Sequence, residues 1–300
     1  MMVLKFIYYF IEIAMKKKSI VYLLISFFII NTLYSQEISV KNTEISTVIP
    51  SEEIVFDTCI ISIQYQMSCI NDVKNPEKAK TNTMVLQIGR RISKFTDFMF
   101  LKIDSMIKEY AEQKMSSMAA MVKLLPLGKG LNQLNIFKNY PQGKITTTDL
   151  IPFKGTFMYV ENKEKPLWRI GDGSITVCGY ECKKATTTFR GRNYTAWYAP
   201  KIAISDGPWK FWGLPGLILK VTDDKKEYDF ECIAVNKSIE LNQIFITKKD
   251  YINTTKAKFN DALKKLNENP GAAIQASGRI KGGLQDKMKS RPYNPIELSQ

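Results

Sequence analysis

The sequence predicts an α+β protein in which a curved, mainly antiparallel β-sheet packs against one long amphipathic helix and a C-terminal helix. Many short segments alternate apolar and polar residues, as half-buried strands do. Over residues 96–125 the apolar residues instead recur at helical spacing. The strands follow one another with few helices between them, and this order favours an antiparallel sheet with helices on one face.

The N-terminal region is typical of a secretory signal peptide. Three lysines, Lys16 to Lys18, precede an apolar run that ends at Ser35, and Gln36 follows. We therefore expect residues 1–35 to be a signal peptide cleaved near Ser35–Gln36, with Met15 as the start. The alternative is an uncleaved membrane anchor, because the apolar run approaches the length of a spanning helix. The small residue at the junction favours cleavage, and hence export to the periplasm, the outer membrane or the medium.

The charge balance of the chain is basic. The full sequence has a net charge of +14, and residues 1–35 carry four lysines and one glutamate, so cleavage leaves +11. Such a chain can be drawn to anionic lipid headgroups or acidic polymers, which allows peripheral membrane contact. Nucleic acid is not an expected partner, because the lysines are scattered and no recognition motif is present. Solubility alone is an equally good explanation of the charge.

The first half of the expected domain, residues 36–268, contains two strands and the long helix. Residues 57–70 alternate as a strand, and MVLQIG from Met84 to Gly89 forms a second one. The amphipathic segment that follows predicts one helix of about five to seven turns that ends before Pro126. Its methionine stripe is explained by packing against the sheet, and the segment after Gly128 is expected to be loop.

The second half is rich in strands and ends in a helix. Its expected strands are residues 145–150, 156–161, 174–189, 193–199, 217–223 and 227–235. Asp223 to Lys226 are expected to form a hairpin turn, and Gly191 lies in a second one. Residues 248–268 are expected to be helical. Residues 269–300 form a basic tail broken by Gly and Pro, which we expect to be partly mobile.

Five cysteines allow disulfides in an oxidising compartment. Cys59 and Cys69 are separated by about 33 Å of strand, whereas a disulfide needs Cα atoms about 5.5 Å apart. Cys178 and Cys182 can pair only if Gly179 makes a tight bend. A long-range bond between Cys182 and Cys232 on neighbouring strands is therefore preferred, and at least one thiol stays free.

The chain has no histidine, and this removes whole classes of mechanism. A Ser–His–Asp triad, a Cys–His pair and the usual histidine-containing zinc sites cannot be built. A C-x3-C pair does not match a four-cysteine zinc site either, so no metal or cofactor is expected. Chemistry by paired carboxylates remains open.

The segment GPWKFWGLPGLILKV, residues 207–221, is the strongest local signal. Leu214–Pro215–Gly216–Leu217 predicts a type II turn, in which glycine supplies a positive φ. The aromatic residues before it, Trp209, Phe211 and Trp212, either cap the open end of the sheet or form an apolar lip for a ligand.

This segment also carries a resemblance. With FRGRNYTAWYAPKIAISD before it, GLPGLI (Gly213, Leu214, Pro215, Gly216, Leu217 and Ile218) resembles the GLPGLI family of exported proteins from Gram-negative bacteria. Further matches are LQIG and SKF in residues 86–95, GYECKKA at 179–185 and NPIEL at 294–298. The resemblance implies export and no established activity. More loosely, the layout resembles periplasmic lipoprotein carriers, in which a curved sheet holds apolar matter against helices.

Three functions remain open. The first is a non-enzymatic envelope protein that binds an apolar or anionic ligand, or a partner protein, through the aromatic lip. Arg190 and Arg192 are then candidates for a carboxylate or phosphate contact, unless they lie on a solvated hairpin tip. The second is a hydrolase that uses carboxylates such as Asp206 and Glu181 without histidine. The third is a structural accessory subunit of an envelope complex.

Overall fold

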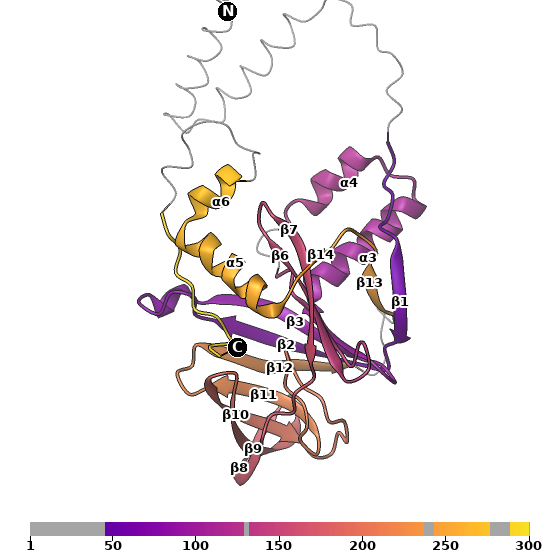
Figure 1. The fold of residues 1–300 in the computed structure, drawn as a ribbon. Coiled ribbons are helices and arrows are strands. Elements are labelled where there is room, and N and C mark those ends of the chain that lie inside the picture. Colours follow the sequence, from indigo (N-terminus) through magenta and orange to yellow (C-terminus); the bar gives the residue numbers. More distant parts are fainter. Residues whose placement is uncertain (1–45, 129–131, 237–242, 277–288, 300) are drawn as a thin grey trace, which may run out of the picture. The chain divides into compact units, whose positions relative to one another are not determined.

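One sheet of twelve strands dominates the fold, in the order β14-β7-β6-β5-β4-β3-β2-β12-β11-β10-β9-β8 (Figure 1). The structure is a computed structural model that describes residues 46–128, 132–236, 243–276 and 289–299; the expected signal peptide lies outside these residues. All neighbours pair antiparallel except β14 and β7, which pair parallel. The strands are β2 (Ile61–Cys69), β3 (Lys80–Ile88), β4 (Ser93–Asp97), β5 (Asn135–Lys138), β6 (Lys144–Ile151), β7 (Gly155–Asn162), β8 (Arg169–Val177), β9 (Tyr180–Phe189), β10 (Arg192–Ala199), β11 (Leu217–Asp223), β12 (Tyr228–Asn236) and β14 (Ile252–Asn253).

A two-stranded sheet and short helices complete the described part of the chain. The small sheet pairs β1 (Glu53–Thr58) with β13 (Gln243–Thr247). The helices are the 3-10 turn η1 (Pro76–Lys78), α3 (Phe98–Glu112), α4 (Ser117–Leu124), α5 (Lys256–Glu268) and α6 (Pro270–Ala276). The fold is thus mainly β, as the alternation predicted, with a large mixed sheet. No helix among the described residues is both long and apolar enough to cross a bilayer.

The expected long helix is two helices, so that prediction is wrong. Helix α3 ends at Glu112, and Lys114 takes a left-handed φ of 51°, which interrupts the helical ladder. Ser116 then caps α4 by accepting a hydrogen bond from the Ala119 backbone N–H. The apolar period continues through the break, which is why it did not reveal the local cap.

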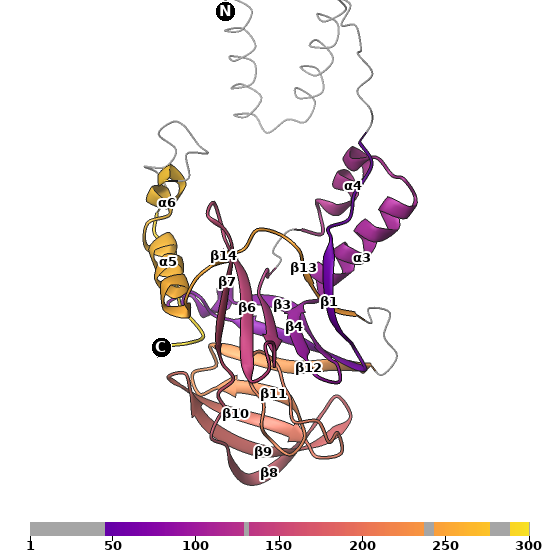
Figure 2. The same cartoon turned by 45° about the vertical axis from the view of Figure 1, so that its right-hand side comes forward.

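Helices α3 and α5 pack on opposite faces of the sheet, not on one. Along β3, Leu86 faces the main core, whereas the next-door Val85 contacts Leu101 of α3 on the other side. Helix α5 packs its Phe259 on Ile151, whose strand carries the core residue Ile145 on the same face. Figures 1 and 2 both show α5 and α3 on opposite sides of β6 and β7.

Several strand boundaries differ from the sequence expectation. The single strand expected over 174–189 is the hairpin β8–β9, which turns at Cys178 and Gly179, both with positive φ. Residues 135–138, expected to be loop, form β5 because they pair with β4 and β6. The C-terminal helix begins at Lys256, capped by Thr255, and not at residue 248.

The GLPGLI segment bends without the expected type II turn. The Leu217 N–H donates to the carbonyl of Ile202, 3.0 Å away, rather than closing a turn on Leu214. Glycine is nevertheless required, because a Cβ at Gly216, whose φ is 154°, would lie 2.4 Å from the Ala199 carbonyl oxygen. The motif therefore brings the loop backbone against the end of β10.

Candidate functional site

A cavity of about 470 Å³ lies between the sheet, helix α5 and the C-terminal segment 292–297. Aliphatic and aromatic side chains form much of its wall: Met67, Leu134, Ile136, Tyr159, Trp209, Tyr228, Phe259, Leu263, Tyr293 and Ile296. Its volume is within the range of small-ligand sites, which usually combine apolar walls with a few polar groups.

Seven carboxamide side chains line the cavity: Asn71, Asn82, Asn132, Gln133, Asn260, Asn267 and Asn294. Some of these are engaged within the protein; Asn267, for example, donates to the Leu263 carbonyl at 2.8 Å. Within the described residues, the side chains of Asn71 and Asn260 have no hydrogen-bond partner. A carboxamide both donates and accepts, so these two can bind an uncharged polar group.

Asp149 is the one carboxylate of the cavity that is not tied to a cation in the described part of the chain. It lies on β6, and the nearby Leu150 N–H donates to its Oδ1 at 2.7 Å. Burial raises the pKa of Asp149 to about 7, although this hydrogen bond lowers it. A carboxyl group that titrates near neutral pH in a cavity is a candidate for ligand binding or proton transfer.

This pKa predicts a pH-dependent stability that Asp149→Asn removes. The folded pKa exceeds the ordinary value of 3.8. Folding therefore favours the protonated form of Asp149. This contribution to the free energy of unfolding is fully present below about pH 4 and is lost as the pH rises through 7. At pH 8 the variant should be more stable than wild type by about 1–3 kcal/mol, since one pKa unit corresponds to ~1.4 kcal/mol and partial exposure reduces the effect. Urea unfolding at pH 4 and pH 8 measures this, with Asp172→Asn on exposed β8 as control. An equal difference between variant and wild type at both pH values contradicts it.

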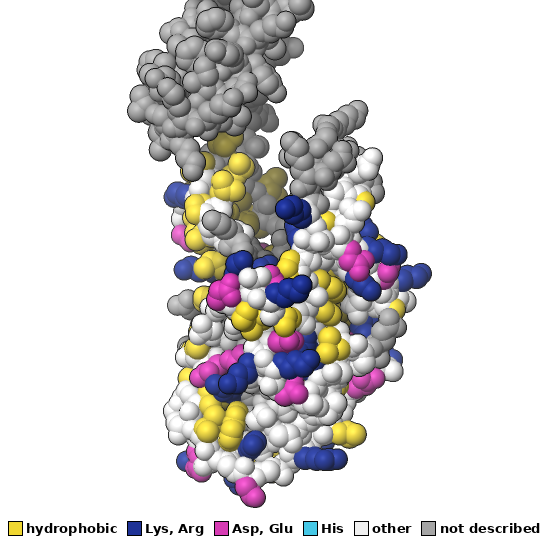
Figure 3. Space-filling view, turned by 90° about the vertical axis from the view of Figure 1, so that its left-hand side faces the viewer, with side chains coloured by type: hydrophobic (Ala, Val, Ile, Leu, Met, Phe, Trp, Pro, Cys, Tyr) yellow, Lys and Arg dark blue, Asp and Glu magenta, His cyan; other side chains and the backbone are white. Residues whose placement is uncertain are grey.

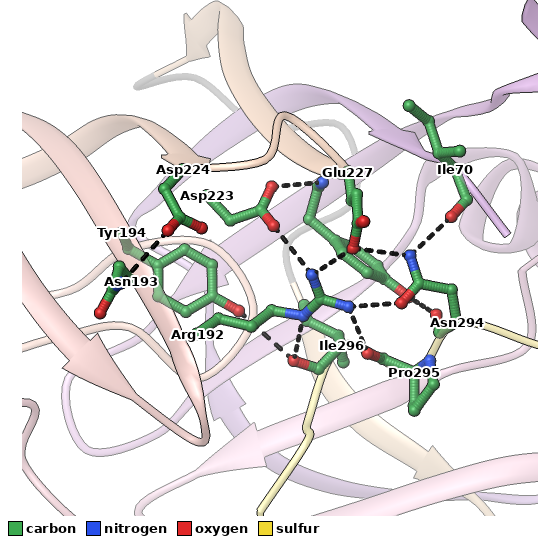
Figure 4. A network of polar contacts seen from close by, with 11 residues as sticks. Ile70, Arg192, Asn193, Tyr194, Asp223, Asp224, Glu227, Asn294, Pro295 and Ile296 are labelled. Atoms are coloured by element: carbon green, nitrogen blue, oxygen red, sulfur yellow. Dashed lines mark hydrogen bonds and ion pairs between the residues drawn. The ribbon is translucent and has the colours of Figure 1, made fainter. Parts of the chain in front are cut away.

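The wall of the cavity formed by residues 294–297 is held by Arg192 of β10 (Figure 4). Its guanidinium donates to Asp223 at 2.8 Å and to Glu227 at 2.6 Å, both within one hairpin. It also donates to Asn294 Oδ1 at 2.6 Å and to the carbonyls of Pro295 and Ile296 at 2.8 Å and 3.2 Å. One planar fork thus joins two carboxylates to three residues of the C-terminal segment.

A second buried network holds Glu297. Its carboxylate pairs with Lys210, with Lys256 of α5 at 2.7 Å and with Arg190 at 3.2 Å. Glu161 of β7 joins the same group, 2.8 Å from Arg190 and 2.5 Å from Lys210. Although burial raises the pKa of Glu297, the charges of Lys210 and Lys256 outweigh it and lower that pKa.

Glycine at the β9–β10 turn leaves room for the C-terminal segment to pack against that turn. Gly191 has a φ of 82°, and a Cβ there would lie 2.9 Å from Leu298 Cβ. The backbone N–H of Leu298 donates to the Arg190 carbonyl at 2.8 Å. Of the expected partly mobile tail, residues 269–300, the segment 294–298 is built into the fold, which the sequence did not indicate.

The sequence predicts that Arg190 and Arg192 contact a carboxylate or phosphate of a ligand, and the partner in this prediction is wrong. Arg190 and Arg192 contact carboxylates, but the carboxylates belong to this chain. Their side chains are only 7% and 2% exposed, so they are neither a free anion site nor a solvated hairpin tip. The hairpin tip is covered by the C-terminal segment, a contact between residues about 100 positions apart that local pattern could not indicate.

The prediction of an exposed aromatic lip is wrong for two of its three residues. Trp209 and Phe211 are 2% and 0% exposed. The Phe211 ring contacts five other aromatic rings: Trp168, Phe189, Tyr194, Trp209 and Phe230. Trp212 is partly exposed and donates its indole N–H to the Glu164 carbonyl at 2.9 Å. Of the three residues, only Trp209 lines the cavity.

The carboxylates suggested for a hydrolase do not form a pair. Asp206 accepts hydrogen bonds from the buried Lys138 and from Ser93, the latter at 2.6 Å. Glu181 lies exposed on β9, opposite Thr176. Neither lines the cavity. The carboxylate that does, Asp149, was missed because TTTDL reads as an ordinary strand; only the packing of α5 and the C-terminal segment encloses it.

All five cysteines are unbonded in this structure. The expected Cys182–Cys232 bond is thus not formed, and the Cys182 thiol instead donates to the Tyr180 carbonyl at 3.4 Å. No cluster of three or more potential ligands that could hold a metal ion occurs among the described residues.

Comparison with known proteins shows few similarities. A family described as "Protein of unknown function (Porph_ging)" matches residues 188–220, which include the GLPGLI motif. No curated protein matches the sequence. Two solved structures of PNGF-II, in space groups P21 and C2, are similar at 15% identity, with TM-scores of 0.43 and 0.42. Each comparison covers 71% of this chain and 34% of the PNGF-II chain, so the chain spans about a third of their length.

Proposed function

We propose that this chain is an exported, non-catalytic cell-envelope protein that binds a small, uncharged ligand in the cavity beneath α5. The ligand would have an apolar face and several hydroxyl or amide groups, as a saccharide does. The observation that carries the proposal is the wall itself, which contains both aromatic rings and carboxamides.

The charges around the cavity argue for a neutral ligand rather than an anionic one. Lys80 and Lys210 are the basic residues of its lining, and Lys210 is already paired with Glu161 and Glu297. Figure 3 shows the face that carries α5, on which basic and acidic side chains are mixed and do not form one basic patch. The proposed ligand therefore has the apolar character expected from the sequence, but it carries uncharged polar groups in place of the anionic group.

The test is native mass spectrometry of the protein purified from its own cells, followed by extraction of bound small molecules. Asn260→Trp fills the cavity from α5, whereas Lys265→Trp places the same side chain on the exposed side of that helix, away from the cavity. A co-purifying neutral species present in wild type and Lys265→Trp, and absent from Asn260→Trp, supports the proposal. Equal occupancy in both variants, or no ligand in wild type together with no stabilisation by a panel of neutral saccharides, overturns it.

Export is tested separately, by sequencing the N-terminus of the protein recovered from the cell envelope. A mature chain that begins at Gln36 supports it. Full-length chain confined to the cytoplasm contradicts it.

Asp149 favours a second candidate, acid–base catalysis on the bound ligand. A carboxyl group with a pKa of about 7 can exchange a proton near neutral pH. If this second function is correct, wild type converts the extracted ligand chemically, whereas Asp149→Asn still binds the ligand but leaves it intact. The non-catalytic proposal expects no conversion by either protein.

A further inference from the structure

The turn between β8 and β9 presents an exposed thiol. Cys178 and Gly179 are its two central residues, with φ of 50° and 79°, and Val177 pairs with Tyr180 across it. Positive φ at both positions is the geometry of a type I′ hairpin turn. Cys178 therefore lies at the tip of the hairpin, where its side chain meets solvent.

The curvature of the sheet brings this tip to a distant strand. Cys232 lies on β12, which is separated from β9 by β11 and β10 in the strand order. Its side chain is nevertheless in one core cluster with Val177 and Cys182. Cys178 is one of the neighbours that raise the pKa of the Cys232 thiol, so the exposed tip lies beside this buried thiol.

The strand at Cys232 is also irregular. The pairing of β12 with β2 shifts between Cys232 and Ala234, as at a β-bulge, and the Cys232 thiol donates to the Ala234 carbonyl at 3.6 Å. A bulge redirects side chains and lets the backbone adjust locally. Movement that brings the two sulfur atoms to bonding distance can therefore be taken up by a turn and a bulge.

We propose that Cys178 and Cys232 form a reversible disulfide that fastens the β8–β9 hairpin to the centre of the sheet. The oxidant is a low-molecular-weight disulfide, such as oxidised glutathione. The Cys178 thiolate attacks it, forms a mixed disulfide and releases one glutathione thiol. The Cys232 thiolate then attacks the Cys178 sulfur and releases the second. Two protein thiols are oxidised, one glutathione disulfide is reduced to two thiols, and the two cysteine protons go to those thiols.

The exposure of the two thiols sets this order of events. Burial raises the pKa of Cys232, so its thiolate is scarce and reacts only with a disulfide that is already held beside it. Cys178, at the exposed tip, meets the oxidant first. Cys182 is buried on β9, where no small disulfide can reach it without local opening.

The experiment treats the purified chain with oxidised glutathione and maps disulfides by mass spectrometry without reduction. Cleavage after Tyr180 separates Cys178 from Cys182 and so distinguishes the two pairings. We expect a Cys178–Cys232 link that dithiothreitol reverses. It should survive in Cys182→Ser and disappear in Cys178→Ser, with wild-type circular dichroism in both variants.

Three outcomes overturn the proposal. One is a Cys182–Cys232 link, retained in Cys178→Ser. Another is a stable glutathione adduct on Cys178 without loss of the Cys232 thiol. The last is two free thiols at these positions after oxidation, in folded wild-type protein.

Discussion

Arg192→Ala is expected to lower the free energy of unfolding by about 3–5 kcal/mol, because it leaves buried carboxylates without their cation. The side chains of Asp223 and Glu227 are 0% and 11% exposed and lose their ion pair. The variant also loses every contact between this guanidinium and residues 294–296, so the cavity wall should loosen. Urea unfolding and limited proteolysis near the C-terminus measure the two effects.

Arg192→Lys separates charge from geometry. Lysine keeps the positive charge, but it cannot form the planar fork that reaches both carboxylates and the Pro295 carbonyl. We expect an intermediate loss of stability and proteolysis as in Arg192→Ala. Arg169→Ala, at an exposed position of β8, is the matched control and should stay within about 0.5 kcal/mol of wild type. A loss below about 1 kcal/mol for Arg192→Ala would show that the network is not structural.

Phe211→Ala is expected to cost about 3–5 kcal/mol, as large-to-small changes of a fully buried phenylalanine do. The ring is 0% exposed and is in contact with five aromatic rings, so its removal leaves a cavity that rigid neighbours cannot fill. Thermal and urea unfolding of the variant measure the loss.

Trp212→Ala, one residue further along, is the matched comparison. Its indole is partly exposed and is fixed by one hydrogen bond to the Glu164 carbonyl and by Lys163 above the ring, 4.2 Å from its centroid. We expect a loss of about 1 kcal/mol. If the two variants lost similar stability, the assignment of Phe211 to the core and Trp212 to the rim would be wrong.

Local signals in the sequence predicted much of the sheet. The β11–β12 hairpin at Asp223 to Lys226 and the strands around residues 145–150 and 156–161 are present, because alternation and turn residues report on a strand's own two faces. The same logic failed at Cys178–Gly179, where a two-residue turn divides one apparent strand into two. Short turns leave the alternation almost unbroken, so only backbone geometry reveals them.

The candidate site depended on contacts between residues far apart in the chain. Arg192 meets Asn294 about 100 residues later, and Asp149 is enclosed by a helix that begins at Lys256. No periodicity links such pairs. The NPIEL segment is part of the resemblance, but its Gly- and Pro-rich surroundings predict mobility and give no sign that it docks.

The sequence by itself determined the strand-rich class, the lack of histidine chemistry and the need for glycine in the GLPGLI segment, since these follow from residue type and local pattern. The tertiary structure alone decided which side chains are exposed. Burial is a property of what packs above a residue, and for Asp149 and Arg192 the covering segments lie about 100 residues or more further along the chain. The tryptophan and phenylalanine expected at a lip thus belong to the core, the arginines expected to bind a ligand bind this protein's own carboxylates, and an inconspicuous aspartate faces the cavity.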